Sequence, residues 1–276
     1  MQNSNPLAKY FRQPAIYIRL PSDGRHYPAN SLEMPENGEL PVYPMTAMDE
    51  ISYRTSDALF NGSAVIEVIK SCVPNIIDPW QMPSSDLDSV LIGIRIASYG
   101  HELELENKCP SCGEENTFVV DLRTIAEQLD MPDYGQKLDV ADLEIHFKPI
   151  SYKQMNQNTL SRFEDQKMIE MIPTMDTTDE EKLKLINASF AKLGKLGVET
   201  VAQGIDFIVI NNETVSDRNH ILQFIQEIDR KMFDAISKHL TNLRKVSDIQ
   251  PMKVQCHNCE HAYDMPFTLD VSNFFA

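Results

Sequence analysis

The sequence predicts an α+β protein that is mainly helical and is organised around two pairs of cysteines. Apolar residues recur at helical spacing over several long stretches, and short alternating stretches of strand type lie between them. Two CxxC pairs stand far apart in the chain, Cys109/Cys112 and Cys256/Cys259. Because structural zinc takes four ligands in a tetrahedron, each pair supplies half of a site. We therefore expect a split zinc ribbon, with two CxxC knuckles, that clamps an inserted helical domain.

The two cysteine pairs lie in matching surroundings. A strand-like segment follows each of them, and Val120 and Phe267 fall at the same offset from the first cysteine of their pair. The pairs are separated by 143 residues (255 − 112), whereas a free-standing ribbon has roughly 15–20. Redox or disulfide pairs are the alternative, but nothing in the sequence indicates the oxidising compartment that disulfides require. We expect one structural Zn²⁺ ion on Cys109, Cys112, Cys256 and Cys259, with Cys72 as a buried core thiol.

Taken in order, the chain predicts four regions. Residues 1–14 form an N-terminal arm, in which Lys9, Tyr10, Phe11 and Arg12 give a basic, aromatic segment suited to docking on a partner; a frayed tail is the alternative. Residues 15–108 form a strand and a three-helix block, residues 109–122 plus 247–276 the split ribbon, and residues 123–246 the mainly helical insert. In the block, we expect a strand over 15–20, an extended segment over 39–45 and a strand over 101–106. We also expect three helices, over 47–60, 64–72 and 86–99. Their predicted N-caps are Thr46, Ser63 and Ser85, in that order.

The insert is predicted to contain one strand, over 142–150, followed by helices. A helix spans 152–172, and Thr177/Thr178 with Glu180/Glu181 fits a capping box for a second one. The apolar spacing carries this second helix as far as Ile208, with a kink or break near Gly194–Gly197. A turn over 211–214 follows, and Ser216 caps a last helix over 217–245.

Charge and motifs restrict the function. The chain has 25 Lys and Arg against 41 Asp and Glu, a net charge of −16 that opposes nucleic-acid binding. No apolar run is long enough to span a membrane, and the N-terminus lacks a signal peptide, so we expect a soluble protein made in the cytoplasm. The sequence contains no phosphate-binding glycine loop, nucleophile elbow or HExxH motif, and four cysteines leave a zinc ion no open position. We therefore predict that the chain is not an enzyme.

Residues from about 39 to 122 resemble the baseplate hub and baseplate assembly proteins of contractile-tailed bacteriophages. The resemblance lies in the stretches PVYPMTAMDEISYRTSDALFNGSAVIEVIKSCVPNI, SSDLDSVLIGIRIASYG and CPSCGEENTFVVDL. It implies a non-catalytic structural or assembly role, with other hub or tail proteins as partners and multiple copies in one assembly. It also implies a location in the host cytoplasm during assembly and, for a retained subunit, in the tail baseplate of the virion. The alternative is a zinc-ribbon nucleic-acid or transcription adaptor.

Overall fold

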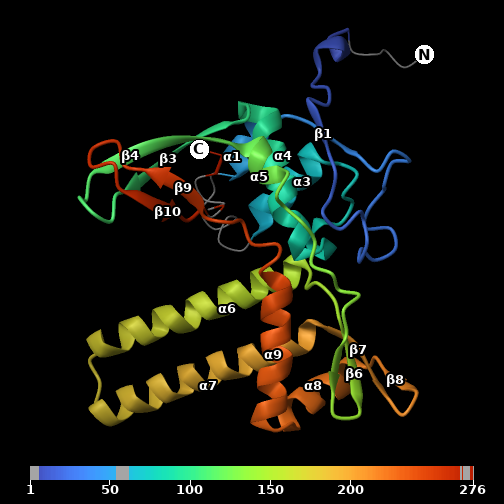
Figure 1. Cartoon of the computed structure of the whole chain (residues 1–276), viewed down its shortest axis with the longest axis vertical. Helices are drawn as coiled ribbons and strands as arrows, with labels where there is room; N and C mark the ends of the chain where they lie inside the picture. Colours follow the sequence, from blue (N-terminus) through green and yellow to red (C-terminus); the bar gives the residue numbers. More distant parts are fainter. Residues whose placement is uncertain (1–5, 54–61, 268, 270–273, 276) are drawn as a thin grey trace. The chain divides into compact units, whose positions relative to one another are not determined.

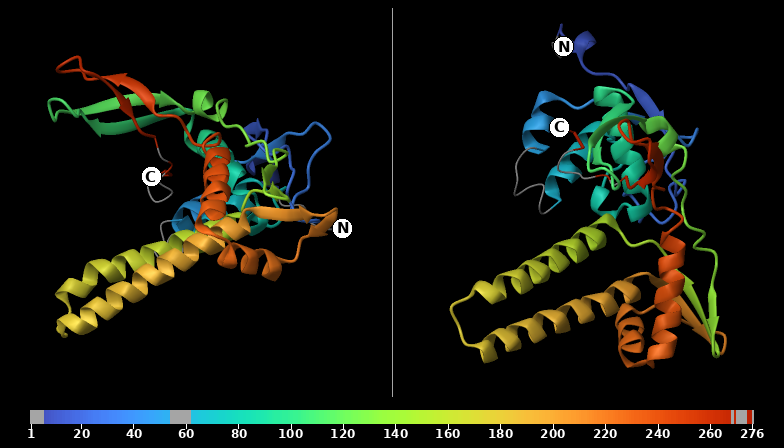
Figure 2. Two further views of the ribbon diagram at one scale, coloured as in Figure 1. Left: turned by 60° about the horizontal axis from the view of Figure 1, so that its bottom comes forward. Right: turned by 60° about the vertical axis from the view of Figure 1, so that its left-hand side comes forward.

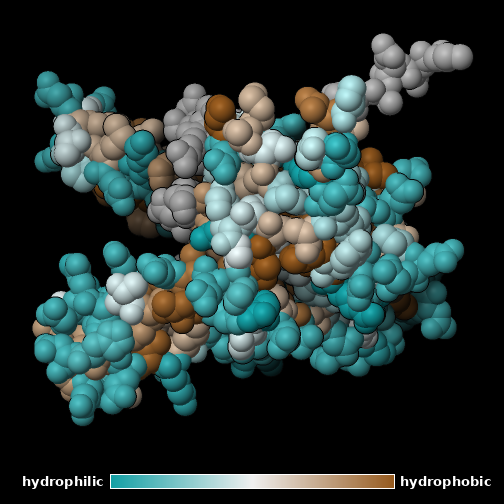
Figure 3. All heavy atoms as spheres, turned by 90° about the horizontal axis from the view of Figure 1, so that it is seen from above, coloured by the Kyte–Doolittle hydropathy of each residue, from teal (hydrophilic) through white to brown (hydrophobic). Residues whose placement is uncertain are grey.

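A computed structural model describes residues 6–53, 62–267, 269 and 274–275 of the chain (Figure 1). The fold is mixed α+β, and the chain divides into two compact units. Unit 1 comprises Met1–Pro79, Ser85–Met131 and Asp248–Ala276, and unit 2 comprises Trp80–Ser84 and Pro132–Ser247. Hydrophilic side chains cover most of the face shown in Figure 3, as expected for a chain with a net charge of −16.

The described residues of unit 1 form short helices and three two-stranded antiparallel sheets. The sheets are β1–β2, β3–β4 and β9–β10. The elements are η1 (Ala8–Tyr10), β1 (Ile16–Ile18), β2 (Leu40–Val42), α1 (Ala47–Tyr53), α3 (Ser63–Cys72), η2 (Pro79–Gln81, which crosses into unit 2), η3 (Ser84–Asp86), α4 (Leu87–Tyr99), β3 (Glu102–Lys108), β4 (Glu115–Asp121), α5 (Leu122–Ala126), β9 (Met252–Gln255) and β10 (Ala262–Met265).

The core of unit 1 is built on α3 and on the first two turns of α4, where most apolar side chains are almost fully buried. Cys72 lies in this core with none of its surface exposed, as predicted. Gly93 is required on α4 because a Cβ there would lie 2.9 Å from Cγ2 of Ile18 on β1. The first half of the helix predicted over residues 47–60 is observed as α1, Ala47–Tyr53. Residues 54–60 lie outside the described residues.

Two of the predicted helix caps are wrong. Ser63 is the first residue of α3, and Gly62 precedes it in a left-handed conformation with φ 77°. Ser85 lies within η3, and Asp86 is the residue that precedes α4. The Asp86 carboxylate does not cap the helix, because it accepts hydrogen bonds from the backbone N–H and the hydroxyl of Ser22 and from Tyr27. A tertiary contact therefore takes the place of the local cap.

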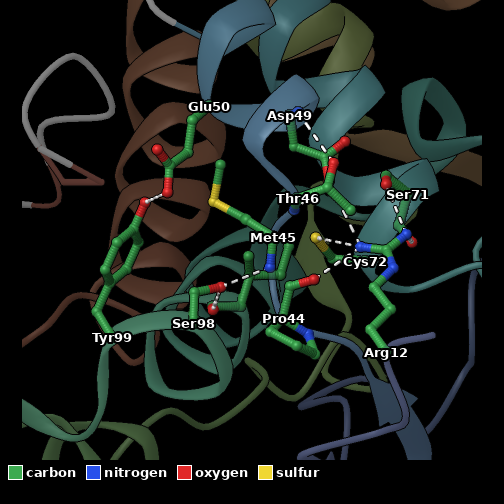
Figure 4. Close-up of polar contacts among 11 residues, drawn as sticks. Arg12, Pro44, Met45, Thr46, Asp49, Glu50, Ser71, Cys72, Ser98 and Tyr99 are labelled. Atoms are coloured by element: carbon green, nitrogen blue, oxygen red, sulfur yellow. Dashed lines mark hydrogen bonds and ion pairs between the residues drawn. The ribbon is translucent and has the colours of Figure 1, made fainter. Parts of the chain in front are cut away.

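Arg12 fixes the end of the N-terminal arm to unit 1 (Figure 4). Its guanidinium donates to the carbonyl of Pro44 at 2.7 Å and to the carbonyl and hydroxyl of Ser71, both at 2.8 Å. Asp49 of α1 lies 3.4 Å from the same group. These contacts hold Arg12 within its own chain, and docking of the arm on a partner stays a prediction.

Unit 2 contains a four-stranded antiparallel sheet in the order β5–β6–β7–β8, together with four α-helices among the described residues. Its elements are β5 (Leu138–Val140), β6 (Leu143–Phe147), α6 (Tyr152–Met171), η4 (Ile172–Thr174), α7 (Asp179–Gln203), β7 (Ile205–Ile210), β8 (Glu213–Val215), α8 (Arg218–Glu227) and α9 (Arg230–Arg244). The core of the unit lies where β6 and β7 meet α8, α9 and the end of α7.

The N-termini of the long helices in unit 2 are capped by side chains. Ser151 and Gln154 form a capping box at α6, and Thr178 accepts a hydrogen bond from the Glu181 N–H at α7. The second cap confirms the predicted start of this helix. Asp217 and Asp229 cap α8 and α9, so the predicted single helix over 217–245, capped by Ser216, is instead two helices.

The end of α7 also differs from its prediction. The helix runs without a break through Gly194 and Gly197, where we expected a kink, and it ends at Gly204. Ile205 and Ile208 then belong to strand β7, although their spacing also fitted a continued helix. Asn211 and Asn212 adopt positive φ of 50° and 65° and form the tight turn to β8, so the turn is shorter than predicted.

Candidate metal centre

The four predicted cysteine ligands lie in the turns of two β-hairpins of unit 1. Strands β3 and β4 pair from Glu102↔Asp121 to Lys108↔Glu115, and their turn contains Cys109 and Cys112. Strands β9 and β10 pair from Met265↔Met252 to Ala262↔Gln255, and their turn contains Cys256 and Cys259. Both views in Figure 2 show the two hairpins side by side. The strands place the two turns together although they are far apart in the sequence.

The two turns have the same backbone hydrogen bonds. The Cys109 N–H donates to Glu114 O at 2.9 Å and the Gly113 N–H donates to Cys109 O at 2.9 Å. At the equivalent positions, the Cys256 N–H donates to His261 O at 2.9 Å and the Glu260 N–H donates to Cys256 O at 3.0 Å. Gly113 and Glu260, each four residues after the first cysteine, both have positive φ, at 75° and 57°. The chain therefore contains two copies of one turn.

The sulfur atoms of the two turns form a compact cluster. The Sγ atoms of Cys109 and Cys259 lie 3.7 Å apart, and those of Cys112 and Cys256 are also 3.7 Å apart. All four Sγ atoms lie within 4.8 Å of one another. A tetrahedral zinc ion with Zn–S bonds of about 2.3 Å requires S–S distances of about 3.8 Å. The donor set and its spacing thus fit a tetrathiolate metal site.

Asn116, on β4, links the two halves of the cluster. Its amide Nδ2 donates to Cys256 Sγ at 3.5 Å, and its Oδ1 accepts from the His257 N–H at 2.8 Å. Only 3% of its surface is exposed. We did not predict this residue from the sequence, but a signal was present: Asn116 is a polar residue on the same strand face as the apolar Phe118 and Val120. A polar side chain on the inward face of a strand requires a buried partner.

The two thiols of the β9–β10 turn differ in acidity. Backbone N–H groups of Cys259 and Asn258 and the amide of Asn116 lower the pKa of Cys256 to about 6. At Cys259 the His261 backbone lowers the pKa, but the neighbouring thiols outweigh it and the pKa rises to about 12. Cys256 is therefore the first of this pair to become a thiolate, which is the form that binds metal.

The arrangement favours a structural role over a catalytic one. Among the described residues, the ligand atoms that come together are the four cysteine sulfurs, and neither His257 nor His261 is among them. The rings of these histidines instead lie near aromatic rings. The ring centroids of His257 and Phe118 are 5.3 Å apart, and those of His261 and Tyr263 are 6.2 Å apart. Four thiolates complete a tetrahedron and leave no position for a reactive water.

Comparison with known protein families identifies a match over most of the chain. The model of a family described as T4 bacteriophage base plate protein matches residues 30–276. No curated protein and no solved structure matches. In the part of the chain that the structure describes, no helix is both long enough and apolar enough to cross a membrane.

Proposed function

The chain belongs to the T4 bacteriophage base plate protein family, and from this premise we propose that it is a non-catalytic component of the baseplate hub of a contractile tail, organised by a structural zinc ion. Its partners are other hub or tail proteins. The chain folds in the host cytoplasm and acts during hub formation. In this proposal the chain has four functional regions: the N-terminal arm, the strand and three-helix block, the split ribbon and the helical insert.

The observation that carries the proposal is the cluster of four sulfur atoms. Cys112 and Cys256 are 3.7 Å apart in space but 144 residues apart in the chain (256 − 112). The chain leaves unit 1 after Met131 and returns to it at Asp248, so the two cysteine pairs flank the insertion of unit 2. Zinc bound by both pairs would join the outgoing and returning chain and fix both hairpins. Such a role requires a rigid fold and no reaction.

The N-terminal arm supplies a docking surface. Leu7, Tyr10 and Phe11 are exposed over 61%, 74% and 57% of their surface. Lys9 lies over the ring of Tyr10, at 4.8 Å from its centroid, which adds a positive charge to this apolar group. Because Arg12 ties the arm to unit 1, the exposed residues are presented from a fixed point. Aromatic and basic side chains of this kind are typical of protein interfaces.

A phage that carries Cys256→Ser tests the proposal. We expect heads and tail components to form normally while incomplete baseplates accumulate, with the defect in the hub. A matched phage that carries Cys72→Ala retains all four cluster cysteines and is expected to assemble baseplates. Separately, deletion of residues 1–11 is expected to leave the fold intact and to reduce incorporation into hub complexes. Normal yields of complete, contractile tails in the absence of this protein would exclude the assembly role.

A further inference from the structure

The two hairpins of the metal centre correspond to each other beyond their turns. Asn116 on β4 and Tyr263 on β10 each lie seven residues after the first cysteine of their pair (116 − 109 and 263 − 256). Val120 and Phe267, four residues further on, are both buried. Side chains two and four residues apart lie on one face of a strand. Asn116 and Tyr263 are therefore equivalent positions on the inward faces of the two hairpins.

Asn116 serves the buried cysteine of the other hairpin. Its amide Nδ2 donates to Cys256 Sγ at 3.5 Å, and the Asn258 N–H donates to the same sulfur at 3.4 Å. Only 1% of the surface of Cys256 is exposed. A buried thiolate cannot be solvated by bulk water, so these two donors take the place of water at the sulfur.

Cys109 is the equivalent cysteine of the first hairpin, and its sulfur lacks such donors. Only 2% of its surface is exposed, whereas Cys112 and Cys259 are exposed cysteines. Among the described residues, the hydrogen-bonding neighbour of the Cys109 sulfur is the thiol of Cys259, at 3.7 Å. A metal-bound cysteine is a thiolate, and a buried thiolate requires N–H or O–H groups that donate to it.

Tyr263 has a donor that lacks an acceptor. Its hydroxyl oxygen is buried and has no hydrogen-bond partner within the part of the chain that the structure describes. Buried hydroxyl groups without a partner are rare, so each requires an explanation. Burial raises the pKa of Tyr263, and so does the negative charge of the four cysteines, with Cys109 the largest of these charge effects. Charges act in this way over a few ångströms, which places the tyrosine beside the cluster.

We propose that Tyr263 is a positioning residue of the metal centre, and that its hydroxyl donates a hydrogen bond to the Cys109 sulfur when metal is bound. This hydrogen bond rests on the proposed function, because it forms at the structural metal named there. Each hairpin then supplies one donor, from the same position, to the buried cysteine of the other hairpin. Four thiolates around a divalent ion leave a net negative charge, and donors to sulfur reduce it. The two donors therefore stabilise the metal-bound form more than the metal-free form.

The zinc affinity of the full-length protein tests this role. A competing chelator sets the free zinc concentration, and the zinc dissociation constant is measured for each variant. Tyr263→Phe removes only the hydroxyl and is expected to raise the constant about tenfold, as is usual for groups that hydrogen-bond to metal ligands. Asn116→Leu removes the donor to Cys256 and should raise it at least as much. Tyr17→Phe removes the hydroxyl of an exposed tyrosine on β1 and should leave it unchanged.

Cobalt provides a second measurement, which a purely structural role of the tyrosine ring would not affect. Co²⁺ bound by thiolates absorbs light through sulfur-to-metal charge transfer, and the energy of these bands depends on the electron density at sulfur. Loss of a hydrogen bond to sulfur raises that density. Tyr263→Phe should therefore shift the charge-transfer bands of the Co²⁺-loaded protein, and Tyr17→Phe should not shift them.

The direction of the effect separates this role from its alternative. If the Tyr263 hydroxyl also lacks a partner in the metal-bound protein, Tyr263→Phe removes a buried unsatisfied group. Zinc affinity and the cobalt bands are then unchanged, and the melting temperature is equal to that of the wild type or higher. That result would overturn the proposal for Tyr263 and leave the zinc centre in place. A wild-type protein that binds neither metal would overturn both.

Discussion

Replacing one cysteine of the cluster is the most direct test of the metal centre. Cys259→Ser removes one of four thiolates and replaces it with a hydroxyl that remains protonated at neutral pH. The variant should lose the single zinc equivalent that we expect in the wild type. Metal binding is coupled to folding when the site exists only in the folded chain, so the variant should also lose stability.

The span between the two cysteine pairs sets the size of this effect. A cross-link between Cys112 and Cys256 closes a loop with 143 intervening residues (255 − 112), and closing a loop of that length corresponds to about 5 kcal/mol. This is an upper limit, because residual structure in the unfolded chain lowers it. A loss of about 3 kcal/mol, at about 2–4 °C for each kcal/mol, lowers the melting temperature by about 10 °C.

The assay combines metal analysis with thermal unfolding. Zinc content by mass spectrometry and melting curves with and without a chelator are measured for wild type, Cys259→Ser and the control Cys72→Ala. Only the wild type and the control should contain zinc and respond to the chelator. A wild-type protein that contains no metal and whose melting curve the chelator does not change would refute the reasoning.

Acid is expected to release the metal. Protons compete with the metal for all four thiolates, so zinc content after dialysis should fall as the pH is lowered stepwise. In the metal-free folded chain the pKa of Cys256, about 6, lies below the unfolded value of about 8.5, so the contribution of this thiolate to stability is complete above the higher pKa and is lost as pH falls through the lower one; denaturant titrations of the metal-free protein between about pH 9 and about pH 5 measure this. Arg12→Ala should reduce the free energy of unfolding by about 2 kcal/mol in denaturant titrations, because the half-buried carbonyls of Pro44 and Ser71 lose a charged donor. Arg25→Ala, at an exposed position, should have little effect. Gly113 and Glu260 both have positive φ, a conformation that glycine adopts freely and that a Cβ atom disfavours. Gly113→Ala should therefore destabilise the fold by about 1 kcal/mol, whereas Glu260→Gly should not destabilise it. Equal losses of stability in the two variants would contradict the equivalence of the two turns.

The elements predicted best are those that local sequence alone determines. Helix α6 was predicted almost to the residue from its apolar spacing, and its start is fixed locally by the capping box of Ser151 and Gln154, which we did not predict. The four-stranded sheet of unit 2 was largely missed, because Ile205–Ile210 is a short apolar run whose spacing fits a helix or a strand. Its pairing with β6 decides between them, and that contact joins residues about sixty apart. The unbroken α7 likewise shows packing that outweighs the weak helix propensity of two glycines.

The cluster of cysteines was predictable because metal chemistry constrains the sequence directly. Four ligands of one kind at CxxC spacing indicate a shared site whatever the length of chain between them, and the structure does bring the four sulfurs together. Asn116 was not predicted, because its role depends on its buried position between the two hairpins. The same is true of Arg12: its charge was evident, but its hydrogen-bond partners on Pro44 and Ser71 are set by tertiary structure.

The separation of the two hairpins has a consequence for the order of events during synthesis. When a ribosome has made Cys112, 143 residues remain before Cys256 (255 − 112), which takes roughly 7–30 seconds at the usual rates of translation. Throughout that interval the first hairpin has no partner for its sulfur atoms. The cluster can close only after Cys259 is made. A nascent chain that stops before Cys259 lacks the second pair of sulfur atoms and cannot complete the cluster, so the cluster is present only in chains that contain both cysteine pairs.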